Sequence, residues 1–156
     1  MRGYTDIPRS TSHCVVFIDE GEIDPEDVEL VQQVREQGYR IAYIDCATYE
    51  DRHWEIPSHI GAQIATHHPP YHEGREANLA RWLDDLIALA YSTPGLIIVL
   101  DNAFVLWNSQ RKFMSELMEA YLIQVHHWLE QKVPCHLCFQ MVPSPLVRQW
   151  FATSAA

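Results

Sequence analysis

Leu96-Ile97-Ile98-Val99-Leu100-Asp101 places five apolar residues in a row before a single acid. A strand that is apolar on both faces is typical of a parallel sheet covered by other layers. Further strand-length stretches occur at 14–19, 41–45 and 135–142, and segments with helical periodicity separate them. This alternation predicts an α/β domain with a mostly parallel sheet of about four strands flanked by helices. We expect the first strand at the edge, beside 41–45.

The predicted helices follow from their start and stop signals. Asp24 and Pro25 suit a helix N-cap and first position, and Gly38 suits the end of that helix. Pro57 opens a short helix with Ile60 and Ile64 facing inward. Prolines and a glycine make 66–74 a loop. Further helices are predicted at 75–91, 103–107 and 109–131, the last with an apolar stripe of Met114, Leu117, Met118, Tyr121, Leu122, Val125, Trp128 and Leu129.

Length and composition indicate one globular unit. The chain has 156 residues, of which 47% are hydrophobic and 21% charged, so 1–156 is expected to form a single domain. No apolar run approaches the ~18 residues of a membrane helix, and we expect no membrane partner. The polar residues 1–9 lack the apolar centre of a signal peptide, and we expect a cytoplasmic protein.

The charge balance favours a basic partner. The chain carries 11 basic and 21 acidic residues, a net charge of −10. Such a domain repels phosphate backbones, and we expect no nucleic-acid binding. Opposite electrostatic fields accelerate the encounter with a basic protein. The alternative is that the acidic surface only keeps the protein soluble.

No motif indicates catalysis or a cofactor. The six glycines are isolated, so no phosphate-binding loop exists, and no G-x-S-x-G elbow occurs. The stretch 96–101 is similar to the magnesium-binding strand of nucleotide hydrolases. A further alternative is therefore that the chain is an adaptor-like relative of these enzymes that has lost its phosphate loop. Asp19, Asp45 and Asp101 are expected to form turns or helix caps. We expect neither enzymatic activity nor a cofactor.

The histidines and cysteines raise the question of a metal site. His67, His68 and His72 share one loop, so a metal-binding protein or metal-dependent enzyme is the alternative function. Pro69 and Pro70 prevent a regular helix there, and no H-E-x-x-H pair is present. Cysteines 135 and 138 have C-x-x-C spacing but would point to opposite faces of a strand. All four are expected to be structural thiols: Cys14, Cys46, Cys135 and Cys138.

Four stretches between residues 41 and 141 together resemble one known family. They are Ala42-Tyr43-Ile44-Asp45; Tyr71 and Gly74 followed by Asn78-Leu79-Ala80-Arg81-Trp82-Leu83-Asp84-Asp85-Leu86; Pro94-Gly95-Leu96-Ile97-Ile98-Val99-Leu100; and Val125-His126-His127-Trp128 through Val133-Pro134-Cys135-His136-Leu137. The resemblance is to the barstar family, the intracellular inhibitors of barnase-type ribonucleases. It implies a barstar-like core at 41–142, with an N-terminal β-α extension at 1–40 and a C-terminal tail at 143–156.

The resemblance also implies where a partner would bind. The family's inhibitory helix carries two aspartates one turn apart; the later corresponds to Asp84 and the earlier to Ala80. The family's acid late on the last helix is replaced near Trp128, with Glu130 the nearest carboxylate. We therefore expect a non-enzymatic immunity protein that binds and occludes a basic toxic enzyme, and the resemblance favours a ribonuclease. The expected contact residues are Tyr71, His72, Glu73, Gly74, Glu76, Ala80, Asp84 and Asp85.

Overall fold

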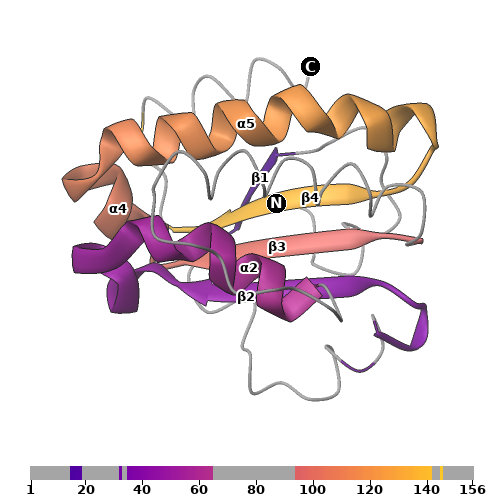
Figure 1. Ribbon diagram of the computed structural model, residues 1–156, viewed down its shortest axis with the longest axis horizontal. Coiled ribbons are helices and arrows are strands. Elements are labelled where there is room, and N and C mark those ends of the chain that lie inside the picture. The colour runs from indigo at the N-terminus through magenta and orange to yellow at the C-terminus, as the bar shows by residue number, and fades with distance from the viewer. Residues whose placement is uncertain (1–14, 19–31, 33–34, 65–93, 142–144, 146–156) are drawn as a thin grey trace.

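The computed structural model describes residues 15–18, 32, 35–64, 94–141 and 145 (Figure 1). Four strands, a 3-10 helix and three α-helices are defined within them. They are β1 (Val15–Ile18), β2 (Arg40–Asp45), η2 (Cys46–Glu55), α2 (Ile56–Ile64), β3 (Leu96–Asp101), α4 (Ala103–Ser109), α5 (Arg111–Glu130) and β4 (Cys135–Gln140). None of the helices in this described part is long and apolar enough to cross a membrane.

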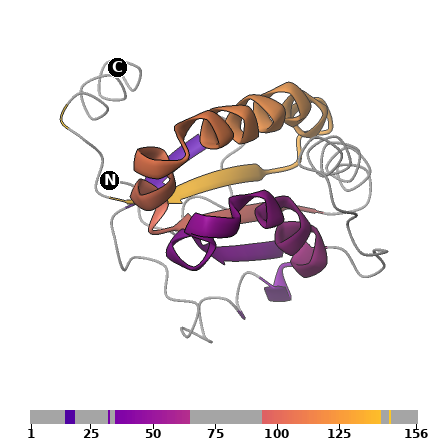
Figure 2. The same ribbon diagram turned by 60° about the vertical axis from the view of Figure 1, so that its left-hand side comes forward.

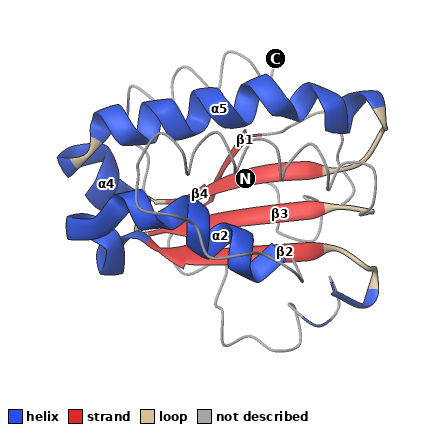
Figure 3. Cartoon of the chain, viewed as in Figure 1, coloured by secondary structure: helices blue, strands red, loops and turns tan. Residues whose placement is uncertain are grey.

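The sheet is built on three parallel strands that lie side by side in chain order (Figure 3). β2 pairs with β3, and β3 pairs with β4, so that Ile44, Leu100 and Phe139 form one row across the sheet. Helices η2 and α2 follow β2 along the chain, and helices α4 and α5 connect β3 to β4. The predicted α/β class, with a parallel sheet flanked by helices, is therefore confirmed.

The position expected for the first strand is wrong. β1 pairs in parallel with β4, at the opposite side of the sheet from β2. The outer edge of β2 is already occupied, because the Gln63 side chain accepts from the Tyr43 N–H (2.7 Å) and donates to the Tyr43 carbonyl oxygen (2.9 Å). These are the two bonds that a neighbouring strand would make with that residue.

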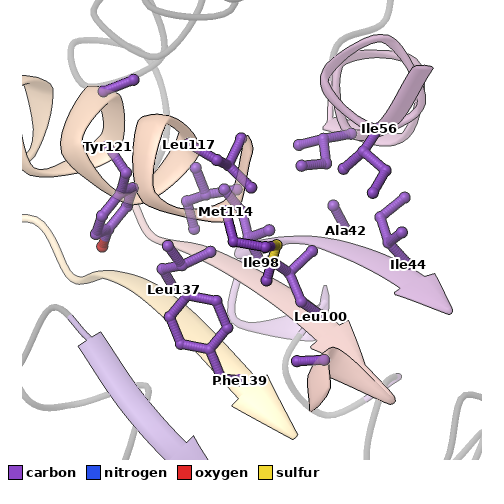
Figure 4. Packing of buried hydrophobic residues seen from close by; sticks show 14 of the residues in the cluster. Ala42, Ile44, Ile56, Ile98, Leu100, Met114, Leu117, Tyr121, Leu137 and Phe139 are labelled. Carbon is purple, nitrogen blue, oxygen red and sulfur yellow. The ribbon is translucent and has the colours of Figure 1, made fainter. Parts of the chain in front are cut away.

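The main core lies between one face of the sheet and the layer of α2 and α5 (Figure 2). Alternate strand residues point into it, as Figure 4 shows for Ala42 and Ile44, Ile98 and Leu100, and Leu137 and Phe139. Ile60 and Ile64 of α2 are fully buried, which confirms their predicted inward direction. β3 is buried on both faces, as its uninterrupted apolar sequence predicts.

The predicted apolar stripe of α5 is only partly correct. Met114, Leu117, Tyr121, Val125 and Trp128 are buried, and Met118 is half-buried against the core. Leu122 and Leu129, by contrast, remain 45% and 44% exposed. Leu122 and Leu129 each follow a buried residue, Tyr121 and Trp128, by one position and therefore lie about 100° further around the helix, beside the core-facing row.

The predicted helix at 24–38 lies largely outside the described residues. The loop at 66–74 and the helix at 75–91 lie wholly outside them. Their structure therefore stays a prediction.

Candidate functional site

All eight predicted contact residues fall in the segment 65–93, outside the residues that the structure describes. They are Tyr71, His72, Glu73, Gly74, Glu76, Ala80, Asp84 and Asp85. The histidines of the alternative metal site, His67, His68 and His72, lie in the same segment, and that hypothesis stays open. The structure instead describes the residues on both sides of this segment. The end of α2 precedes it and the start of β3 follows it, and together they form the frame of segment 65–93.

A single residue, Arg40 at the start of β2, contacts both ends of that frame. Its guanidinium Nη1 donates to the carbonyl oxygen of Ile64, the last residue of α2, at 2.8 Å. Its backbone N–H donates to the carbonyl oxygen of Gly95, just before β3, at 2.9 Å. A cation at a helix C-terminus also interacts favourably with the helix dipole. Arg40 therefore joins the residue before segment 65–93 to a residue just after it.

Close packing at two glycines reinforces this junction. Gly38 has a φ of +81°, and a Cβ there would lie 3.0 Å from Pro94 Cγ. A Cβ on Gly95 would lie 2.8 Å from the ring of Tyr39. Both positions exclude a side chain, so the turn before β2 lies directly against the start of β3.

A hollow of about 340 Å³ opens beside the junction. Arg35, Tyr39 and Arg40 are among the residues that line it. The side chain of Gln63, which also borders it, is engaged with Tyr43. The hollow thus lies at the amino-terminal edge of the sheet, beside the start of β2.

A hydrogen-bonded cluster occupies the opposite, carboxyl-terminal edge. The Asp101 carboxylate accepts from the Asn102 N–H (2.8 Å), from Gln140 Nε2 (2.9 Å) and from the hydroxyl of Tyr43. These donors come from β2, β4 and the turn after β3, so one carboxylate ties all three strand ends together. Both of its oxygens are engaged, which gives Asp101 a structural role.

Asp45 performs a similar task one strand away. Its side chain caps η2 by accepting from the Ala47 N–H at 3.1 Å, and it also accepts from Thr48 Oγ1 (3.2 Å) and Asn102 Nδ2 (2.9 Å). The prediction that Asp45 caps a helix is confirmed. Within residues 15–18, 35–64 and 94–141, no three His, Cys, Asp or Glu side chains gather in a way that could hold a metal.

The described cysteines are buried and free. Burial, followed by the nearby carboxylates of Asp45 and Asp101, raises the pKa of the Cys46 thiol to about 12. Burial also raises the pKa of Cys138. Cys135 belongs to the core cluster and Cys138 does not, in agreement with their predicted opposite faces. Protonated thiols are poor nucleophiles and metal ligands.

Sequence reasoning missed a second surface, on the outward side of α5. Ser115, Met118, Glu119, Leu122 and Ile123 line a hollow of about 410 Å³ there. The signal for it is the surplus of apolar residues on this helix, because Leu122, Ile123 and Leu129 exceed what one core-facing row can contain.

No protein-family model, curated protein or solved structure matches the chain. The element order, the charge and the resemblance described above are therefore the features that bear on function.

Proposed function

We propose that this chain is a barstar-like immunity protein, a non-enzymatic inhibitor that binds and occludes a basic toxic enzyme. A barnase-type ribonuclease is the partner that the resemblance favours. The observation that carries the proposal is the order of the sheet. β2, β3 and β4 are consecutive parallel neighbours, and they coincide with the three stretches that resemble the family's three strands.

The electrostatics support this type of partner. A nuclease site must be cationic to bind phosphate groups, and carboxylates on a rigid helix can imitate those groups. The net charge of −10 would draw such an enzyme to the inhibitor over distances comparable to the Debye length.

The frame around segment 65–93 supports the proposed location of the binding surface. The resemblance assigns the inhibitory loop and helix to the connection between β2 and β3, which contains Tyr71 and Asp84. Arg40 contacts the residues that bracket this connection. A binding surface needs support from packed residues outside it, and this junction supplies it.

The departure at Ala80 supports a partner that differs from barnase itself. The family's earlier aspartate is missing there, while Glu76 stands four positions before Ala80 in the sequence, one turn earlier in the helix predicted at 75–91. A carboxylate moved by one turn shifts by about 5.4 Å. The cognate enzyme would therefore present its cation at a different place.

The proposal extends to organisation and location. Residues 41–142 form the inhibitory core, 1–40 the added extension and 143–156 a tail, all within one domain. The protein acts in the cytoplasm, where an inhibitor protects the cell that produces the toxin.

Inhibition of RNA cleavage tests this function. The full-length chain is titrated into a panel of barnase-type ribonucleases acting on a fluorogenic RNA substrate. We expect one-to-one inhibition of at least one enzyme, and no RNA cleavage by the chain alone. A complete lack of inhibition at about 10 µM, where affinities as weak as micromolar are detected, would contradict the proposal.

A further inference from the structure

The second face of the sheet, opposite the layer of α2 and α5, is also buried at its centre. Ile97, Val99 and Cys138 are fully buried. They alternate along β3 and β4 with residues of the main core, so they point to the opposite face. The buried apolar residues of the described helices, by contrast, all belong to the main core. The cover of the second face therefore comes from another part of the chain.

The order of the strands indicates which connection crosses this face. β3 is joined to β4 through α4 and α5, which pack on the first face. The connection from β1 to β2, residues 19–39, runs across the sheet in the opposite direction, because β1 lies beyond β4 (Figure 1). Connections between parallel strands are right-handed in about 98% of cases. Two right-handed connections that cross a sheet in opposite directions lie on opposite faces, which assigns 19–39 to the second face.

The ends and the length of this connection fit such a path. β1 ends with Ile18 at the carboxyl-terminal edge of the sheet, and β2 begins with Arg40 at the amino-terminal edge. A connection between parallel strands needs about a dozen residues or more and is usually an α-helix. The sequence predicts a helix at 24–38, and the described residues near its end are helical: Gln32, Arg35 and Glu36.

One described contact locates the end of this helix. Arg35 borders the same hollow as Ile41 of β2. Ile41 pairs in register with Ile97, so both point to the second face. The helix therefore ends beside that face, at the edge where β2 begins.

Exposure near the end of the helix indicates which side of it faces solvent. Gln32, Arg35 and Glu36 are exposed, and Gln32 Nε2 donates to Glu36 Oε1 at 3.2 Å. Because successive residues are about 100° apart, Val34 stands nearly opposite Gln32 and Glu36, with Leu30 one turn before it. The side away from solvent is thus apolar.

We propose that residues 24–38 form the helix that covers the second face of the sheet, with Leu30 and Val34 directed at the strands. The extension 1–40 is then a layer of the same core and not a separable addition. This inference stands on the strand order and on burial, and it does not depend on the proposed inhibitory function.

Alkylation of Cys138 measures the cover of the second face. The full-length chain is treated with iodoacetamide, and each cysteine is quantified by mass spectrometry. Val34→Ala should accelerate the reaction of Cys138 at least about fivefold, because the loss of two buried methyl groups favours local opening. Cys135 points into the main core and is the internal reference, whose rate should change by less than about twofold.

Two further variants identify the segment that provides the cover. Gln32→Ala, on the exposed side of the same helix, and Leu83→Ala, in the helix predicted at 75–91, should leave the rate of Cys138 near that of wild type. An acceleration by Leu83→Ala as large as that by Val34→Ala would assign the cover to 75–91 and overturn the proposal. A wild-type rate of Cys138 in Val34→Ala, or an equal acceleration of Cys135 and Cys138 in that variant, would overturn it too. The same holds for a wild-type rate that falls as protein concentration rises, which would assign the cover to a second copy.

Discussion

The guanidinium group of Arg40 donates to the carbonyl oxygen of Ile64, the last residue of α2, at 2.8 Å. The contact spans 24 positions in sequence and lies next to the segment that carries the proposed binding surface. The neighbouring backbone bond from Arg40 to Gly95 fixes the other end of that segment. The position of the proposed inhibitory residues in 65–93 would thus depend on a residue that belongs to the sheet.

Arg40→Met should loosen segment 65–93. The substitution removes a part-buried hydrogen bond with a charged donor, for which we expect a loss of about 1.5–3 kcal/mol in the free energy of unfolding. Amide hydrogen exchange should accelerate most within 65–93. The control Arg52→Met removes a cation whose side chain is 50% exposed and should change stability by less than about 0.5 kcal/mol. Unchanged exchange in the segment would show that Arg40 does not hold it.

Gln63→Leu should expose the outer edge of the sheet. It removes both hydrogen bonds to the Tyr43 backbone, so we expect a loss of about 1–2 kcal/mol in chemical denaturation. Unpaired strand edges also promote association, and light scattering should increase.

Gln63→Glu serves as the partial replacement for this test. A glutamate can accept from the Tyr43 N–H but cannot donate to its carbonyl oxygen. Its effect should lie between those of wild type and Gln63→Leu. Equal stability of all three proteins would contradict the edge-closing role.

Sequence periodicity predicted most of the described fold because burial leaves a local pattern. The apolar run at 96–101 coincides with β3, and Ile60 and Ile64 of the predicted helix are buried. The neighbour of the first strand was not predictable, because apolar residues specify a buried strand and not its partner. The outer edge of β2 is bonded at Tyr43 to the side chain of Gln63, a contact that spans 20 positions and follows no periodicity.

Tyr43→Phe should weaken the hydrogen-bonded cluster around Asp101 at the carboxyl-terminal edge of the sheet. The hydroxyl that Asp101 accepts is lost while the ring remains. Thermal or chemical unfolding should show a loss of about 1–2 kcal/mol. Tyr49→Phe is the matched control, because this half-buried ring packs against the core and no described residue hydrogen-bonds its hydroxyl. Similar losses for both variants would remove the special role assigned to Tyr43.

Cys46 should make stability decrease in alkaline solution. The ordinary pKa of its thiol is 9.0, and burial raises that pKa to about 12 in the folded chain. Between these values the folded state binds the proton more tightly than the unfolded state, so stability is complete below 9.0 and falls as pH rises toward 12. Urea denaturation across this range should show a smaller decrease for Cys46→Ala. Parallel decreases in the two proteins would argue against burial of this thiol.

The candidate site was accessible to sequence reasoning only through the resemblance. Tyr71, Asp84 and their neighbours have no motif of their own, and they lie outside the described residues. The supporting contacts of Arg40 were not predictable, because side-chain bonds to distant backbone atoms leave no pattern in the sequence. The hollow on α5 was missed for a different reason: Leu122 and Leu129 were assigned to the core-facing row of the helix, and they lie beside that row.

The proposed inhibitory role makes Asp84 the position whose substitution should affect binding most. Asp84→Lys should weaken binding to the inhibited ribonuclease by about 2 kcal/mol or more, because the charge reversal opposes a desolvated cation. Tyr71→Ala should also weaken binding, since aromatic anchors dominate interface energies. The control Glu50→Lys makes the same charge change at an exposed residue of η2 and should leave short-range binding nearly intact.

The measurement that tests the central claim most directly is the dissociation constant of the full-length chain with that ribonuclease, by calorimetry, for these four proteins. We predict one-to-one binding by wild type and Glu50→Lys, and a loss of about thirtyfold or more for Asp84→Lys. Binding of Asp84→Lys and Tyr71→Ala as tight as wild type would contradict an inhibitory surface in segment 65–93.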